Sequence, residues 1–155
     1  MPEKSWNIIS KADAILKGPV GETAGDVVVK IRRGLDLYAN IRPAKSLPNV
    51  KALRSNVDLV IVRENTEDVY VRAEYMVTND VAVALRVISR RASERIARVA
   101  FELASTRRKK VTIVHKANVL TVSDGLFRSV ARSIGERYRD VVVDEMYIDA
   151  AVMDL

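Results

Sequence analysis

The residues best suited to do chemistry lie in one short stretch, where an apolar strand is predicted to end. Val111–Val114 has the length and composition of a buried strand, and His115, Lys116 and Asn118 follow it. A lysine at such a position is costly to desolvate unless it meets a partner charge, and burial makes it a better base. Most lysines at strand ends keep the ammonium in water, so position alone predicts a catalytic role for Lys116 only weakly.

Three arginines are suited to bind an acid with more than one carboxylate. Arg32 falls inside a predicted helix, Arg42 in an extended segment, and Arg63 directly after the apolar run Val57–Val62. The planar guanidinium presents paired donors that match a carboxylate. Ligands of open α/β sheets bind beyond the carboxyl ends of strands, where Arg63 lies. A single arginine is more often a surface or ion-pair residue, so the hypothesis is that the three converge.

Two other polar features have plainer interpretations. His115 is the only histidine, and a histidine at a strand end is more often packed than catalytic, so we assign it a supporting role. Glu67 and Asp68 could act as paired carboxylates in hydrolysis, but nothing else in the chain supports that reaction.

These residues are positioned by an alternation of helices and strands that predicts an α/β fold. The predicted helices are Pro2–Ser10, Val27–Leu37 with Asp26 as N-cap after a loop over Gly21–Asp26, Arg90–Arg108, Gly125–Tyr138, and one that begins at Asp149. The predicted strands and extended segments are Asp13–Gly18, Tyr38–Lys45, Val57–Val62, Val111–Val114 and Val141–Ile148. The continuous apolar run Val57–Val62 is typical of a strand covered on both faces.

The stretch Val69–Val87 predicts a long β-hairpin. Apolar residues occupy alternate positions on both sides of Thr78-Asn79-Asp80. An isolated two-stranded hairpin is marginally stable in water, so we expect this arm to pack against something else. The plainer alternative is an ordinary hairpin within one sheet.

Composition excludes several classes of protein. The 155 residues suffice for a domain with its own core, and the absence of cysteine excludes disulfides and thiolate metal sites. No apolar run approaches the ~18 residues of a membrane span and no signal peptide follows Met1, so we expect a cytoplasmic protein that does not bind membranes. The net charge is +6, but the basic residues are spread along the chain and mixed with 20 acidic residues. Aromatic residues make up only 5%, and both features disfavour nucleic-acid binding.

Four motifs resemble those of the β-decarboxylating dehydrogenases, the family of isopropylmalate, isocitrate, homoisocitrate and tartrate dehydrogenases. They are IRPAK at 41–45, VRENTEDVY at 62–70, HKANVL with SDG at 115–125, and MYIDA at 146–150. They occur in the family's order, and the resemblance runs from about Ala12 to Leu155. It implies an isopropylmalate dehydrogenase-like α/β fold, mostly the smaller dimerisation domain with a protruding hairpin arm. Residues 1–38 would be a remnant of the larger cofactor domain, and residues 39–155 the small substrate and dimerisation domain.

The resemblance also implies roles for particular residues. Arg32, Arg42 and Arg63 would bind the malate part of a hydroxy dicarboxylate. Lys116 would be the base that takes the hydroxyl proton, reaching into the site of a second subunit, and Tyr70 would be the acid that protonates the enolate.

Two further residues match cofactor-binding positions of the family. Asn118 would face the nicotinamide of NAD, and Asp149 would bind Mg2+ or Mn2+. The family supplies two more metal-binding aspartates from a later segment, and this sequence does not contain that segment. We therefore expect an incomplete portion of the enzyme that is inactive alone and forms a homodimer through the 69–88 arm.

The implied reaction is NAD-dependent oxidative decarboxylation of a 2-hydroxy dicarboxylic acid. Isocitrate-type members commonly carry a serine and an asparagine where this chain has Asp26 and Val28, which are poor carboxylate receivers. The apolar segment GETAGDVVVKIR resembles archaeal isopropylmalate dehydrogenases, so 3-isopropylmalate is the preferred substrate. Because RENTED also occurs in homoisocitrate and isocitrate enzymes, these two remain alternatives, as does an inactive dimerising fragment.

Overall fold

A computed structural model describes residues 2–21, 25–51 and 54–154 of the chain. The chain divides into two compact units, Met1–Leu37 and Tyr38–Leu155. Each unit is described by itself below.

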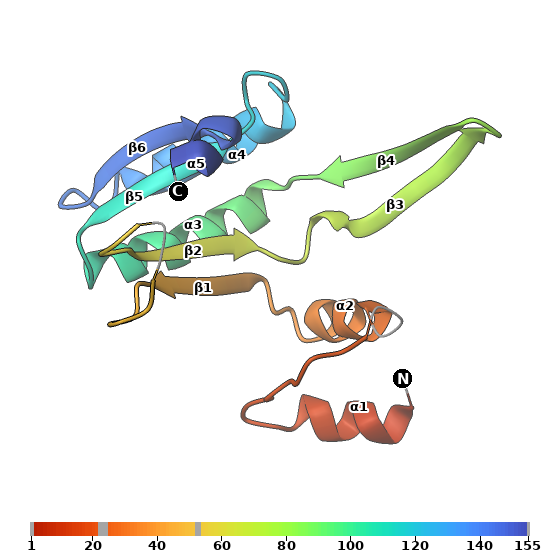
Figure 1. Cartoon of the computed structure of the whole chain (residues 1–155). Coiled ribbons are helices and arrows are strands. Elements are labelled where there is room, and N and C mark those ends of the chain that lie inside the picture. Colours follow the sequence, from red (N-terminus) through yellow and green to blue (C-terminus); the bar gives the residue numbers. More distant parts are fainter. Residues whose placement is uncertain (1, 22–24, 52–53, 155) are drawn as a thin grey trace. The chain divides into compact units, whose positions relative to one another are not determined.

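The first unit contains helices α1 (Glu3–Ser10) and α2 (Gly25–Gly34), shown in red and orange in Figure 1. The predicted helix over 2–10 is confirmed. Gly34 is required by close approach, because a Cβ there would collide with the indole ring of Trp6. Helix α2 ends three residues before the predicted Leu37, where the Leu37 amide donates to the Arg32 carbonyl at 2.8 Å.

Two predictions for the first unit are wrong. The segment Asp13–Gly18 is not a strand; Leu16 is fully exposed, and no neighbouring strand pairs with this segment in the part of the chain described. Asp26 is not the N-cap, since α2 begins at Gly25 and Asp26 lies in its first turn, where a carboxylate suits the positive end of the helix dipole. Residues 22–24 of the predicted loop lie outside the described residues.

The strands of the second unit form three two-stranded sheets among the residues described. The pairs are β1 (Ala39–Lys45) with β2 (Asp58–Glu64), β3 (Asp68–Thr78) with β4 (Val81–Val87), and β5 (Lys110–His115) with β6 (Val142–Tyr147). Only the third pair is parallel. The helices are α3 (Arg90–Ser105), α4 (Ser123–Gly135) and α5 (Ile148–Asp154). Each matches a predicted element to within a few residues.

The core of the second unit is formed by α3, α4 and the β5–β6 sheet. Helix α3 starts where Ser89 accepts a hydrogen bond from the Ala92 amide at 3.1 Å. Its apolar face buries Phe101 completely, and this ring stacks on Tyr138 with centroids 5.2 Å apart. The buried cluster comprises Ala97, Phe101, Ala104, Ile113, Ala131, Ile134 and Val141.

Strand β2 departs from its prediction. It was expected to be covered on both faces, but most of its residues are only half-buried and Ile61 is 46% exposed. Glu64 pairs with Arg95 of α3, and Asp58 pairs with Arg107, which follows that helix.

The hairpin predicted over Val69–Val87 is present as β3 and β4, which extend away from α3 in Figure 1. Apolar side chains remain exposed along it: Val69, Tyr75, Met76, Val77, Val81, Leu85 and Val87. Across the described ranges, no helix is both long and apolar enough to cross a membrane.

Candidate functional site

The β1–β2 ladder brings Arg42 and Arg63 to one face of their sheet. Asn40 lies opposite Arg63 and Arg42 opposite Ile61, so the two arginines are diagonal neighbours. Arg42 Nε donates to Asn40 Oδ1 at 3.2 Å, and Asn40 Nδ2 donates to Asn65 Oδ1 at 3.4 Å. These amides connect Arg42 to Asn65, which follows the carboxyl end of β2. Asn40 and the buried Asn65 were not singled out from the sequence, although they occur within or beside the motifs.

Arg63 also joins this face to Tyr70. Its Nη2 donates to the phenol oxygen at 2.9 Å, and its guanidinium carbon lies 5.0 Å from the ring centroid. The hydrogen bond and the cation–π contact both come from this one guanidinium and hold the half-buried ring beside it. The structure therefore brings together Arg42, Arg63 and Tyr70.

The acidic residues of the RENTED segment do not form a paired-carboxylate site. Glu64 accepts from the amides of Thr66 and Glu67 at 2.7 and 2.8 Å, which folds the segment into a turn. Glu67 accepts from the amide and hydroxyl of Ser89 at 2.8 and 2.6 Å. Asp68 instead accepts from Arg86 at 2.6 Å. Since Glu67 and Asp68 are bound to different partners, the geometry gives no support to hydrolysis by this pair.

Lys116 and Asp149 meet because β5 and β6 are parallel. His115 pairs with Tyr147, so both strands end at the same edge, and Lys116 and α5 begin there. Lys116 Nζ forms an ion pair with Asp149 Oδ2, and this hydrogen bond holds the pKa of the Asp149 carboxyl below its usual value. Two residues selected separately from the sequence are thus direct neighbours.

The turn after β5 is fixed by two buried side chains. The amide of Lys116 donates to Asp124 Oδ2 at 2.6 Å, and the amide of Ala117 donates to His115 Nδ1 at 3.2 Å. His115 Nε2 lies 3.6 Å from Glu145 Oε2. The exposed Asn118 lies in this turn. The role of Asp124 was missed, although its place in the SDG motif was a usable signal.

Glu145 is the carboxylate near His115 Nε2, and it is held by two arginines. Burial acts to raise the pKa of this carboxyl, but hydrogen bonds from Arg132 and Arg128 outweigh burial and lower it. Arg128 Nε donates to Oε2 at 2.9 Å, and Arg132 Nε donates to Oε1. His115 therefore supports the turn through Ala117, Glu145 is bound by the two arginines, and both side chains are largely buried.

The contacts above do not include two predicted parts of the site, Arg32 and a metal ion. Arg32 lies in α2 of the first unit, and its convergence with Arg42 and Arg63 stays a prediction. In the described part of the chain, no group of three or more acidic, histidine or cysteine side chains could hold a metal ion. Mg2+ needs about six oxygen ligands, so Asp149 alone does not fit a complete metal site.

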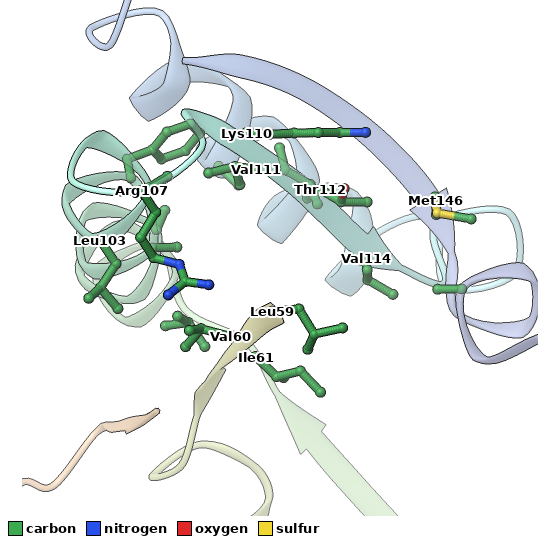
Figure 2. A pocket seen from close by; sticks show the side chains of 18 of the residues that line it. Leu59, Val60, Ile61, Leu103, Arg107, Lys110, Val111, Thr112, Val114 and Met146 are labelled. Atoms are coloured by element: carbon green, nitrogen blue, oxygen red, sulfur yellow. The ribbon is translucent and has the colours of Figure 1, made fainter. Parts of the chain in front are cut away.

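A separate apolar groove of about 690 Å³ lies between β2 and β5. Figure 2 shows Leu59 and Ile61 of β2 facing Val114 of β5 across it, with Leu103 of α3 at one side. Arg63, Tyr70 and Lys116 do not line this groove. It is distinct from the polar site.

Comparison with known proteins matches the whole chain, residues 1–155, to the isocitrate/isopropylmalate dehydrogenase family model. The chain is 57% identical to a 3-isopropylmalate dehydrogenase of Saccharolobus solfataricus, covering 100% of this chain and 46% of that relative. It is 56% identical to one of Sulfurisphaera tokodaii, covering 100% and 45%. The chain thus spans less than half the length of these relatives.

The fold agrees with this match. An isocitrate dehydrogenase structure from Methylococcus capsulatus superposes with a TM-score of 0.87 at 39% identity, covering 99% of this chain and 48% of that one. The sequence motifs, the fold and the family match agree, and the chain belongs to the isocitrate/isopropylmalate dehydrogenase family.

Proposed function

We propose that this chain forms part of an NAD-dependent dehydrogenase that oxidatively decarboxylates a 2-hydroxy dicarboxylic acid, with 3-isopropylmalate as the preferred substrate. The observation that carries the proposal is the contact of Arg63 with Tyr70, on the same sheet face as Arg42. Identity of 57% to a 3-isopropylmalate dehydrogenase supports the choice of substrate.

The arginines are proposed to bind the substrate's carboxylates. Arg42 and Arg63 present their guanidinium groups from one face, and Arg32 of the first unit is the third arginine proposed. Because Arg63 donates to the Tyr70 oxygen, the phenol's own proton is directed elsewhere. Tyr70 can therefore donate that proton to the carbon of an enolate bound beside Arg63, which is the acid step after decarboxylation.

Lys116 is proposed as the base that takes the hydroxyl proton of the substrate, in the site of a second subunit. Its contact with Asp149 orients the amine, and the hydrogen bond from its own amide to Asp124 fixes the backbone of the turn. Asp149 is proposed as this chain's single ligand to Mg2+ or Mn2+, with the remaining ligands supplied from outside the chain. Asn118 is proposed to face the nicotinamide of NAD, which accepts the hydride.

The chain is proposed to be an incomplete portion of the enzyme. In the described residues, β2 and β5 each pair with one strand and turn their other edges toward the apolar groove. An extended apolar segment supplied from outside the chain would satisfy both edges. The second unit is proposed as the substrate and dimerisation domain, joined to a second copy through the 69–88 arm, and the first unit as part of the cofactor domain.

The experiment is a chimera in which these 155 residues replace the matching segment of the Saccharolobus enzyme. NADH formation is followed with Mg2+ or Mn2+ and 3-isopropylmalate, homoisocitrate or isocitrate in turn. We expect turnover with 3-isopropylmalate, and a loss of roughly 100-fold or more in Tyr70→Phe and in Lys116→Gln. Lys110→Gln is the matched control because Lys110 is an exposed lysine at the other end of β5, paired with Asp144.

Each other outcome has a defined meaning. Turnover with isocitrate alone would overturn the proposed substrate. A folded chimera that forms no NADH with any of the three acids would overturn the proposed reaction. The 155-residue chain by itself is expected to form no NADH. If it is inactive but dimeric by sedimentation, that result alone would equally fit the alternative of a dimerising fragment, so the chimera decides between the two.

A further inference from the structure

Asp124 is a buried carboxylate that the proposed reaction does not use. It lies in the first turn of α4 and is only 7% exposed. Oδ2 accepts the Lys116 amide at 2.6 Å, and Oδ1 accepts Arg86 Nη1 at 3.1 Å. Each oxygen therefore holds a different part of the second unit.

Arg86 connects this carboxylate to the base of the hairpin. It lies near the end of β4, and its Nε and Nη2 donate to the two oxygens of Asp68 at 2.6 and 3.1 Å. Asp68 is the first residue of β3, at a φ of 60°, and Tyr70 follows two residues later. The hydrogen bond from Arg86 lowers the pKa of Asp68, so this carboxylate stays charged at neutral pH.

We infer that Asp124 and Arg86 are positioning residues that tie the turn carrying Lys116 to the base of the strand carrying Tyr70. Displacement of the hairpin base is then transmitted through the guanidinium and the carboxylate to the backbone of Lys116. The inference rests on the proposed function for the roles of Lys116 and Tyr70, and on the hydrogen bonds of Arg86 and Asp124 for the connection itself.

Helix capping does not account for this arrangement. A carboxylate in the first turn of a helix is favourable by itself, because it meets the positive end of the helix dipole. Asp124 instead accepts from the Lys116 amide, which precedes its helix by several residues, and from Arg86 of β4. Charge-assisted bonds of this kind are about twice as strong as neutral ones, and removing the arginine leaves a buried carboxylate without its counter-charge.

Hydrogen exchange in the full 155-residue chain tests the connection without any need for turnover. The Lys116 amide is compared by NMR with the amide of Ile113 in the preceding strand β5, which reports the stability of the core. We expect Arg86→Gln to speed exchange at Lys116 about tenfold relative to Ile113, because it removes the ion pair that holds Asp124 in place as the acceptor of this amide. Arg86→Lys, which keeps the charge, should restore most of the protection.

The matched control is Arg107→Gln, which removes an arginine of similar exposure that is paired with another aspartate, Asp58. It should leave Lys116 and Ile113 in their original ratio. Unchanged exchange at Lys116 in Arg86→Gln, or equal acceleration of both amides, would overturn the inference. If Arg86→Gln does not fold, Asp124→Asn decides by the same ratio. The proposed function is judged by the chimera's turnover, so either proposal can fail alone.

Discussion

The helical core and the β3–β4 hairpin differ in how far they bury their apolar side chains. In the core, Phe101 is fully buried between α3 and α4 and stacks on Tyr138. In the hairpin, Tyr75 and Met76 are 60% and 59% exposed. The same kinds of residue are therefore covered by the chain's own elements in one region and left in contact with solvent in the other.

The register of the hairpin explains why it cannot cover itself. Tyr75 pairs with Val83 and Ala73 with Leu85, so these four side chains share one face of a two-stranded ribbon. Two strands without a second layer leave both faces open, and such ribbons are marginal in water. The core is stable through its own packing, whereas the hairpin's apolar face has the composition of a contact surface.

The two residues proposed to act as acid and base lie in different regions of the second unit. Tyr70 belongs to the base of the hairpin, and Lys116 follows a strand of the core. Arg86 and Asp124 bridge the two regions through charged groups. The hairpin base and the turn after β5 are thus connected by charged groups, whereas the core is held by apolar packing.

The largest predicted effect is on the core. Phe101→Ala should lower the free energy of unfolding by about 3–5 kcal/mol, because it leaves a cavity in a fully buried cluster. Urea unfolding followed by circular dichroism measures the change. Tyr75→Ala is the matched control in the hairpin and should change the stability of the monomer by less than about 0.5 kcal/mol. Equal losses in both variants would contradict the contrast between the two regions.

Local patterns predicted most elements of this fold, because periodicity is a local property. The spacing of Ile96, Ala100 and Ala104 predicted α3, and strict alternation predicted β3 and β4. The segment Asp13–Gly18 was wrong because a strand needs a partner, and its apolar composition carries no information on whether one is present.

The site was predictable only in part. Arg42, Arg63 and Tyr70 come from neighbouring motifs, and the structure brings them together. The bridge from Arg86 to Asp124 spans 38 positions, and nothing in the sequence marks these two residues as partners. Such a contact depends on how β4 and α4 are placed, which local patterns do not determine.

The second prediction sharpens the contrast by testing the hairpin as a contact surface. Leu85→Asp should weaken self-association roughly 100-fold, because it places a charge within the exposed apolar face. Sedimentation over a range of concentrations measures the dissociation constant. Asp80→Asn, at the hairpin's turn, is the control and should leave that constant unchanged. A wild-type chain that stays monomeric at micromolar concentration would remove the hairpin's assigned role.

The third prediction concerns the contribution of Glu145 to stability in acid. Glu145→Gln should lower the free energy of unfolding at neutral pH by about 1–2 kcal/mol, because it weakens the bonds from Arg128 and Arg132. The pKa of Glu145 is lowered from 4.5 in the folded chain, so its contribution is present above that value and is lost as pH falls through the folded-state pKa. Urea unfolding from about pH 3 to pH 7 should show a smaller loss on acidification in the variant. An unchanged pH dependence would show that Glu145 is not a source of acid sensitivity.

The smallest effect is expected at the surface of the core. Lys109 pairs with Asp140 at 2.8 Å, but both side chains are more than half exposed. Water screens such pairs and ordering two long side chains costs entropy, so Lys109→Gln should leave the midpoint of urea unfolding unchanged within error. Added salt should likewise not separate the variant from the wild type. A clear loss of stability would mean that surface charge, as well as the packing around Phe101, stabilises this region, and the contrast with the hairpin would then need an electrostatic explanation.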